Sequence, residues 1–180
     1  MPWEGKSEFT LSKGDYTFSV RVPSWADKFE VKVNGEAVEY DVKKGYAYIQ
    51  RAWADGDKVE VTMPLEVKMI EANPLVRADS GKVAICRGPV VYCLESKDNG
   101  DRLSSIKLCG DPIFRCEKDD ELFEGSISIY AKAVKKKAWE TEDLYKAFTS
   151  CYEDVEIKAI PYAFWGNRDD NREMAVWVRY

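Results

Sequence analysis

At 180 residues, with 45% hydrophobic and 33% charged residues, the chain has the balance of an ordinary folded protein rather than a disordered one. No apolar run approaches the roughly 20 residues that a membrane-spanning helix needs, so no membrane partner is expected. The formal net charge of -5 argues against a nucleic-acid partner, because such binding relies on Lys and Arg side chains that neutralise phosphates.

Histidine is absent, which removes the commonest general base and a leading metal ligand. The cysteines are odd in number and include no Cys-x-x-Cys pair, so the spacing of zinc and redox motifs is missing. They are Cys86, Cys93, Cys109, Cys116 and Cys151. We interpret them as structural free thiols, which favours a reducing compartment. The start, residues 1–6, lacks the pattern of a secretory signal, so we expect a cytoplasmic rather than a secreted protein.

The first half of the chain has the pattern of short strands separated by turns. Tyr16 to Val22 alternates strictly, with Tyr16, Phe18, Val20 and Val22 on one face, and Pro23 ends it. Phe29 to Val33 alternates in the same way and runs through Asn34-Gly35, a strong hairpin signal, into Ala37 to Tyr40. Gly45 to Gln50 and Lys58 to Met63 follow, with turn residues between them. We therefore predict a first β-sandwich over residues 1–73, incomplete at its N-terminus.

A second unit is expected over residues 74–180, since the strand pattern stops near Asn73-Pro74 and then restarts. Lys82 to Cys86 and Pro89 to Leu94 form apolar runs joined at Arg87-Gly88, which favours strands buried on both faces. Further alternating runs are Gly125 to Val134, Val155 to Ile160 and Met174 to Val178. Ser96 to Gly100 is expected to be a polar loop, and Thr141 to Ser150 either one or two helical turns or an insertion between strands. The prediction is an all-β protein of two consecutive antiparallel, jelly-roll-like β-sandwich units with little helix.

Three segments carry a resemblance to a known family. They are Arg21 to Ala26 followed by Val33-Asn34-Gly35-Glu36; Gly45 to Trp53 followed by Gly56-Asp57; and Arg87 to Glu95. The opening Pro2 to Lys6, and Ile160-Pro161-Tyr162 with Trp165 to Arg168 near the end, are similar too. In these segments, which occur in the same order, the chain resembles the C-terminal region of the bacterial β-L-arabinofuranosidases of glycoside hydrolase family 127.

Members of that family have an N-terminal (α/α)6 barrel followed by two β-sandwich domains. The resemblance implies that the catalytic glutamate, the nucleophilic cysteine and the cysteine-bound zinc belong to that barrel, and that none lies in this chain. We therefore expect a non-catalytic region whose partner is the upstream barrel of the same polypeptide, with no catalytic, cofactor or metal residues of its own. Homo-oligomer formation stays open. The alternative is a carbohydrate-binding module that recognises plant or microbial glycans, and an autonomous enzyme is disfavoured because no nucleophile and base pair is evident.

Neighbouring carboxylates and tryptophans offer other candidates. The pairs Asp55 with Asp57 and Asp119 with Asp120 lie in polar stretches, where Asp side chains usually bond nearby backbone to form turns. Trp25 and Trp53 lie at strand ends and favour buried corner packing, and Trp177 is expected in the core.

Pro161 to Arg168 forms an aromatic loop that ends in polar groups. It could dock onto another domain, bind a ligand, or cap the sandwich. Because aromatic and Arg residues are enriched at interfaces, we predict an interdomain or ligand contact here and favour an interdomain or oligomer contact over a sugar site. The candidate contact residues are Tyr162, Trp165, Asn167 and Arg168.

Overall fold

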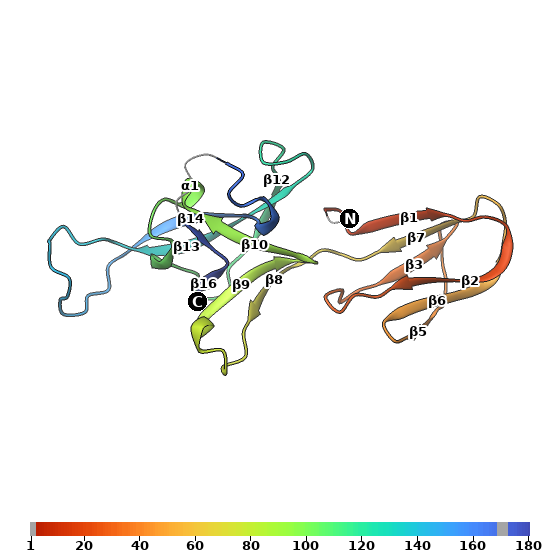
Figure 1. Ribbon diagram of the computed structural model, residues 1–180, viewed down its shortest axis with the longest axis horizontal. Coiled ribbons are helices and arrows are strands. Elements are labelled where there is room, and N and C mark those ends of the chain that lie inside the picture. Colours follow the sequence, from red (N-terminus) through yellow and green to blue (C-terminus); the bar gives the residue numbers. More distant parts are fainter. Residues whose placement is uncertain (1–2, 169–172) are drawn as a thin grey trace. The chain divides into compact units, whose positions relative to one another are not determined.

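The computed structural model describes residues 3–168 and 173–180, and its regular secondary structure is almost entirely β-strand (Figure 1). The chain divides into two compact units, Met1–Glu66 and Val67–Tyr180. The expected boundary lay near Asn73-Pro74. It falls earlier because Val67–Glu71 pairs along its length with Lys82–Arg87 and so belongs to the second unit. Within the described residues, no helix has the length and apolar character needed to cross a membrane.

The first unit holds two antiparallel sheets. One has the order β1-β7-β3-β4 and the other β2-β6-β5. Their strands are β1 (Lys6–Thr10), β2 (Gly14–Arg21), β3 (Glu30–Val33), β4 (Glu36–Ala37), β5 (Asp41–Lys43), β6 (Tyr46–Trp53) and β7 (Lys58–Thr62).

The two sheets of this unit share one core, because β3 and β7 of one sheet and β2 and β6 of the other contribute apolar residues to the same cluster. Val31, Val33, Val59 and Val61 come from β3 and β7, and Ile49 and Trp53 from β6. Tyr16, Phe18 and Val20 of β2 pack against them, as the alternation predicted. Trp53 is buried and donates a hydrogen bond from Nε1 to the carbonyl of Tyr16 over 2.9 Å, so its predicted corner packing is confirmed.

The turns of the first unit follow the sequence signals. Asn34 and Gly35 take positive φ values of 52° and 84°, as a tight hairpin between β3 and β4 requires. Asp57 accepts hydrogen bonds from the amide of Ala54, at 2.8 Å, and from the Asn34 side chain, at 2.9 Å. Its side chain therefore serves the turn, as expected.

The second unit contains one large sheet that closes on itself. Its strands are β8 (Val67–Glu71), β9 (Lys82–Arg87), β10 (Val90–Glu95), β11 (Ile106–Lys107), β12 (Arg115–Lys118), β13 (Ile127–Lys136), β14 (Tyr152–Pro161), β15 (Met174–Ala175) and β16 (Trp177–Arg179). Hydrogen-bonded pairing runs β9-β10-β14-β13-β11-β16 and returns from β16 to β9, which makes a closed ring of six strands. Only β11 and β16 pair in parallel within the described sheet.

The interior of this ring is the main core of the second unit. It includes Ile85, Tyr92, Leu94, Ile106, Leu108, Ile129 and Ile157, all nearly inaccessible to solvent. In β9 and β10 consecutive residues are buried, which confirms the two-sided burial expected for these runs. Trp177 is only half-buried, and its neighbour Val178 enters the core instead, because the strand presents alternate residues to opposite faces.

Helical structure in the second unit is short. It comprises η1 (Arg77–Asp79), α1 (Ser96–Asn99), η2 (Leu103–Ser105) and η3 (Tyr162–Phe164). Ser96–Asn99 forms a helical turn where a polar loop was expected. Residues 141–150 form neither helix nor strand and belong to a long connection between β13 and β14. Of the two readings of that segment, the helical one is therefore wrong.

Candidate functional site

The predicted contact loop follows β14 and leaves part of its aromatic surface open to solvent. Tyr162 and Trp165 are 43% and 45% exposed, and Asn167 is exposed as well. Phe164 lies between them in sequence and is half-buried, and its ring stacks on Phe123 with centroids 5.1 Å apart. Two aromatic side chains of the loop are thus available to a partner.

Arg168, the last of the predicted contact residues, makes contacts within the second unit. Its Nε donates to Glu95 Oε2 at 3.1 Å, and its Nη1 donates to Asp98 Oδ1 at 3.0 Å. The Gly166 amide donates to the other oxygen of Glu95 at 2.8 Å. The Glu95 side chain is 0% exposed, and hydrogen bonds to Asp98 and Glu95 raise the pKa of Arg168. Arg168 therefore holds the aromatic loop onto the end of β10 and onto α1.

A second ion pair extends this buried network. Lys158 Nζ lies 2.7 Å from Asp119 Oδ2 and 4.0 Å from Asp98. Burial alone would raise the pKa of Asp119, but hydrogen bonds from Lys158 and Ser128 outweigh it and hold the pKa below its usual value. A general acid in glycoside hydrolysis needs a raised pKa, which is opposite to the direction found for Asp119. Asp120 accepts a hydrogen bond from the Gly125 amide, as a turn residue does.

The family resemblance assigns the zinc to the upstream barrel, and the chemistry of the cysteines in this chain does not suit a zinc site. Burial raises the pKa of the Cys93 thiol to about 12 and also raises that of Cys86, so both favour the neutral thiol and not the thiolate that binds metal. The other three cysteines are exposed, and all five are free. Across residues 3–168 and 173–180, no group of three His, Cys, Asp or Glu side chains is placed to hold a metal ion.

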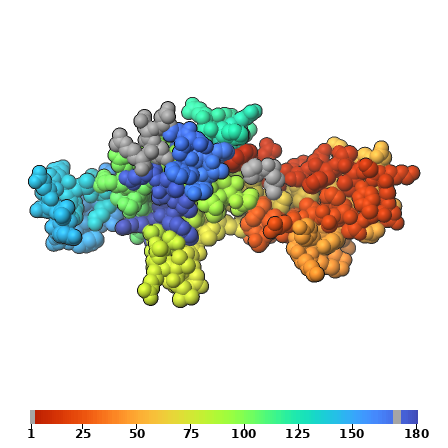
Figure 2. All heavy atoms as spheres, in the orientation of Figure 1, coloured from red at the N-terminus to blue at the C-terminus, as the bar shows by residue number. Residues whose placement is uncertain are grey.

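An exposed apolar arm lies in the connection between β13 and β14. We use the name for residues 138–150, which extend beyond the ends of these strands (Figures 1 and 2). Leu144, Tyr145 and Phe148 are 83%, 91% and 80% exposed. Lys146 lies over the Trp139 ring at 4.5 Å, and Lys136 lies over Phe148 at 5.6 Å. Apolar side chains that cluster in solvent in this way are typical of a surface that meets a partner.

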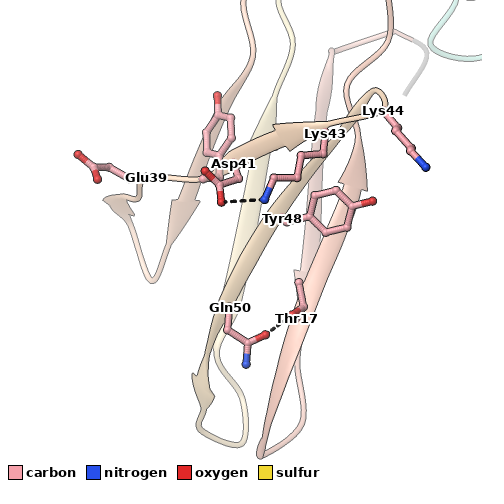
Figure 3. A pocket seen from close by; sticks show the side chains of 8 residues that line it. Thr17, Glu39, Asp41, Lys43, Lys44, Tyr48 and Gln50 are labelled. Atoms are coloured by element: carbon pink, nitrogen blue, oxygen red, sulfur yellow. Dashed lines mark hydrogen bonds and ion pairs between the residues drawn. The ribbon is translucent and has the colours of Figure 1, made fainter.

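An open groove of about 990 Å³ lies on the first unit, over the sheet β2-β6-β5 (Figure 3). Its walls mix aromatic, amide, hydroxyl and charged groups. They comprise Thr17, Glu39, Tyr40, Asp41, Lys43, Lys44, Tyr48 and Gln50. Strands were predicted at β2 and β6, but their outward residues were not identified as candidates. The signal was present, because the alternation that buries Ala47 and Ile49 turns the residues between them outward. The outward residues of β6 are Tyr46, Tyr48 and Gln50.

The fold and these surfaces describe a β-rich region that lacks a recognisable catalytic centre in its described residues, and comparison with known proteins identifies the family. Residues 1–65 match the middle domain of the β-L-arabinofuranosidases of glycoside hydrolase family 127, and residues 67–179 match the C-terminal domain of that family. The chain belongs to glycoside hydrolase family 127, and it carries these two domains.

Individual relatives agree with this assignment. The non-reducing end β-L-arabinofuranosidase of Bifidobacterium longum subsp. longum is 30% identical over 99% of the chain. The crystal structure of a family 127 β-L-arabinofuranosidase from Geobacillus stearothermophilus T6 superposes with a TM-score of 0.90 at 41% identity, again over 99% of the chain. A further β-arabinofuranosidase structure of family 127 gives a TM-score of 0.87 at 34% identity. The chain spans 29% of the length of each of the first two relatives.

Proposed function

We propose that this chain is the non-catalytic accessory region of a β-L-arabinofuranosidase-like glycoside hydrolase, and that it packs on and supports an upstream catalytic (α/α)6 barrel of the same polypeptide. The observation that carries the proposal is the coverage. Nearly all of the chain matches the relatives, yet it accounts for only 29% of their length and matches the middle and C-terminal domain models. The catalytic groups and the zinc would then be supplied by the barrel.

The proposal includes a finer assignment of the fold. The two antiparallel sheets of the first unit, which share one core, support a jelly-roll-like sandwich there. The second unit differs from a simple sandwich, because six of its strands form a closed ring. We assign it as a jelly-roll-like variant in which the two layers are joined by this closure. In both units the strands form rigid layers that can present loops to a neighbouring domain.

Two surfaces of the second unit support a role in docking. The apolar arm presents Leu144, Tyr145 and Phe148 to solvent, and the aromatic loop presents Tyr162 and Trp165. Aromatic side chains are enriched in the buried centres of interfaces and are frequent hot spots of binding energy. Charged residues, by contrast, are depleted there, and Arg168 of the loop is already held within the unit by Glu95 and Asp98.

Replacing the arm residues Leu144, Tyr145 and Phe148 together by Ser should separate docking from folding. In a longer protein that includes the upstream domain, we expect the thermal midpoint to fall, because loss of an aromatic anchor costs about 2 kcal/mol of contact energy. In the 180-residue chain the midpoint should stay the same, because these side chains are 80% to 91% exposed. Differential scanning calorimetry of both proteins measures the two effects.

The matched control replaces Leu75 and Ile113 by Ser, since these residues are 88% and 89% exposed but lie outside the arm. This control should leave the thermal midpoint of both proteins unchanged. An arm variant that loses no stability in the longer protein, or that destabilises the isolated chain to the same extent, would contradict the docking role.

A further inference from the structure

We propose that the outer face of the sheet β2-β6-β5 is a binding site for a neutral oligosaccharide. We call this surface the tyrosine face and define it by Tyr46, Tyr48, Gln50, Thr17, Asp41 and Lys43. The inference concerns the first unit by itself and does not rest on the docking role proposed for the second.

The strand register places these side chains in rows on one side of the sheet. Residues directly opposite each other on paired antiparallel strands point to the same face. Tyr48 is flanked by Ser19 of β2 and Asp41 of β5, and Gln50 is opposite Thr17. Tyr46 in turn lies between Arg21 and Lys43. Every strand of the sheet therefore contributes polar groups around a central line of two tyrosines.

The two tyrosines form an aromatic platform. Their ring centroids are 6.5 Å apart, the ring planes meet at 48°, and the side chains are 43% and 36% exposed. Buried Ala47 and Ile49 alternate with them and fix the strand to the core, so the platform stands on a rigid base. Since sugars present apolar C–H faces as well as hydroxyls, an exposed ring removes those faces from water when it stacks on them.

Polar groups around the platform suit hydroxyl groups. Thr17 donates to the Gln50 side-chain oxygen, and Gln50 donates to Asp15 at 3.2 Å. Asp41 and Lys43 form an ion pair of 3.5 Å on the other side, and both side chains are more than 70% exposed (Figure 3). Amide, carboxylate, ammonium and hydroxyl groups together offer both donors and acceptors, and each hydroxyl of a sugar can accept from the donors or donate to the acceptors.

The charges of the groove select a neutral ligand. Its lining holds two acids, Glu39 and Asp41, and two bases, Lys43 and Lys44, which cancel formally. A polyanion needs clustered positive charge, and a polycation needs the reverse. A groove of about 990 Å³ lies at the upper end of ordinary ligand sites, and it is open rather than enclosed, as a chain-like ligand requires.

The test is titration of the isotopically labelled 180-residue chain with linear tetrasaccharides of arabinose, xylose and glucose, followed by amide NMR. We expect at least one of them to give saturable shifts centred on residues 46–50, with a dissociation constant on the order of 1 mM or tighter. Tyr48→Ala should weaken that binding at least about tenfold, and Tyr48→Phe, which keeps the ring, by no more than about threefold. The shifts should persist at 0.5 M salt, because a neutral ligand gains little from screened charges.

Tyr152→Ala is the matched control, since this tyrosine is 41% exposed but lies at the start of β14 in the second unit. This variant should bind the tetrasaccharide as tightly as the unchanged chain does. Gln50→Ala, which removes an exposed amide without touching the core, provides a second loss-of-binding variant should Tyr48→Ala fail to fold. Three outcomes would overturn the proposal. They are no shift with any tetrasaccharide at about 10 mM, equal binding by folded Tyr48→Ala, and shifts that 0.5 M salt abolishes.

Discussion

Arg168→Met should lower the free energy of unfolding of the 180-residue chain by about 3 kcal/mol, because it leaves a buried carboxylate without its counter-charge. Glu95 is 0% exposed and Asp98 is 14% exposed at the side chain, and Arg168 donates hydrogen bonds to both. The change also removes the side-chain anchor of the aromatic loop and leaves the hydrogen bond from the Gly166 amide to Glu95 as a remaining link to the end of β10. Urea unfolding followed by circular dichroism measures the loss.

An exposed arginine in the same unit is the natural comparison. Arg115 pairs with Glu117 and Glu156, but its side chain is 50% exposed, so Arg115→Met should cost no more than about 1 kcal/mol. Combining Arg168→Met with Glu95→Leu should recover part of the stability, since the double variant removes both buried charges. Equal costs for the two arginine variants, or no recovery in the double variant, would show that the buried pair does not fix the loop.

Trp53→Ala should cost about 3 to 5 kcal/mol and loosen the first unit. The indole is 3% exposed, lies within 6.4 Å of the Phe18 ring and 6.1 Å of the Tyr16 ring, and donates its N–H to the Tyr16 carbonyl. The change leaves a large cavity and removes the hydrogen bond to the Tyr16 carbonyl at once. Thermal and urea unfolding of the chain measure the cost.

Trp165→Ala provides the control, because it deletes the same ring at a site that is 45% exposed. In the isolated chain it should change the free energy of unfolding by no more than about 1 kcal/mol. The two variants therefore differ in burial but not in chemistry. If Trp53→Ala were as mild as Trp165→Ala, the shared core of the two sheets would not be the source of the first unit's stability.

The longer strands could be predicted from sequence because their signal is local. The burial of these strands is visible within a single segment of sequence, as alternation in Tyr16 to Val22 and as an apolar run in Lys82 to Cys86. The structure has strands at both segments. The short strands show no such pattern. Arg115–Lys118 is exposed throughout, and Ile106–Lys107 contains only two residues, so neither shows a period.

Closure of the second sheet and the buried ion pairs depend on contacts between distant segments. The ring closes through β16, which pairs with β9 nearly a hundred positions earlier. Glu95 and Arg168 are separated by 73 positions, and a lone acid at the end of an apolar strand was the only local sign of their pairing. Sequence placed Arg168 correctly in an aromatic loop but could not show that its side chain turns inward.

We propose that this chain supports catalysis by a neighbouring domain and performs none itself. The most direct measurement is the hydrolysis of an aryl β-L-arabinofuranoside by the purified, tag-free 180-residue chain at high protein concentration. We expect a rate equal to that of buffer, because the thiols of Cys86 and Cys93 favour the neutral form and the buried carboxylates Glu95, Asp98 and Asp119 are held in ion pairs. Turnover that scales with chain concentration and disappears on one substitution within the chain, such as Cys93→Ser or Glu95→Gln, would contradict it.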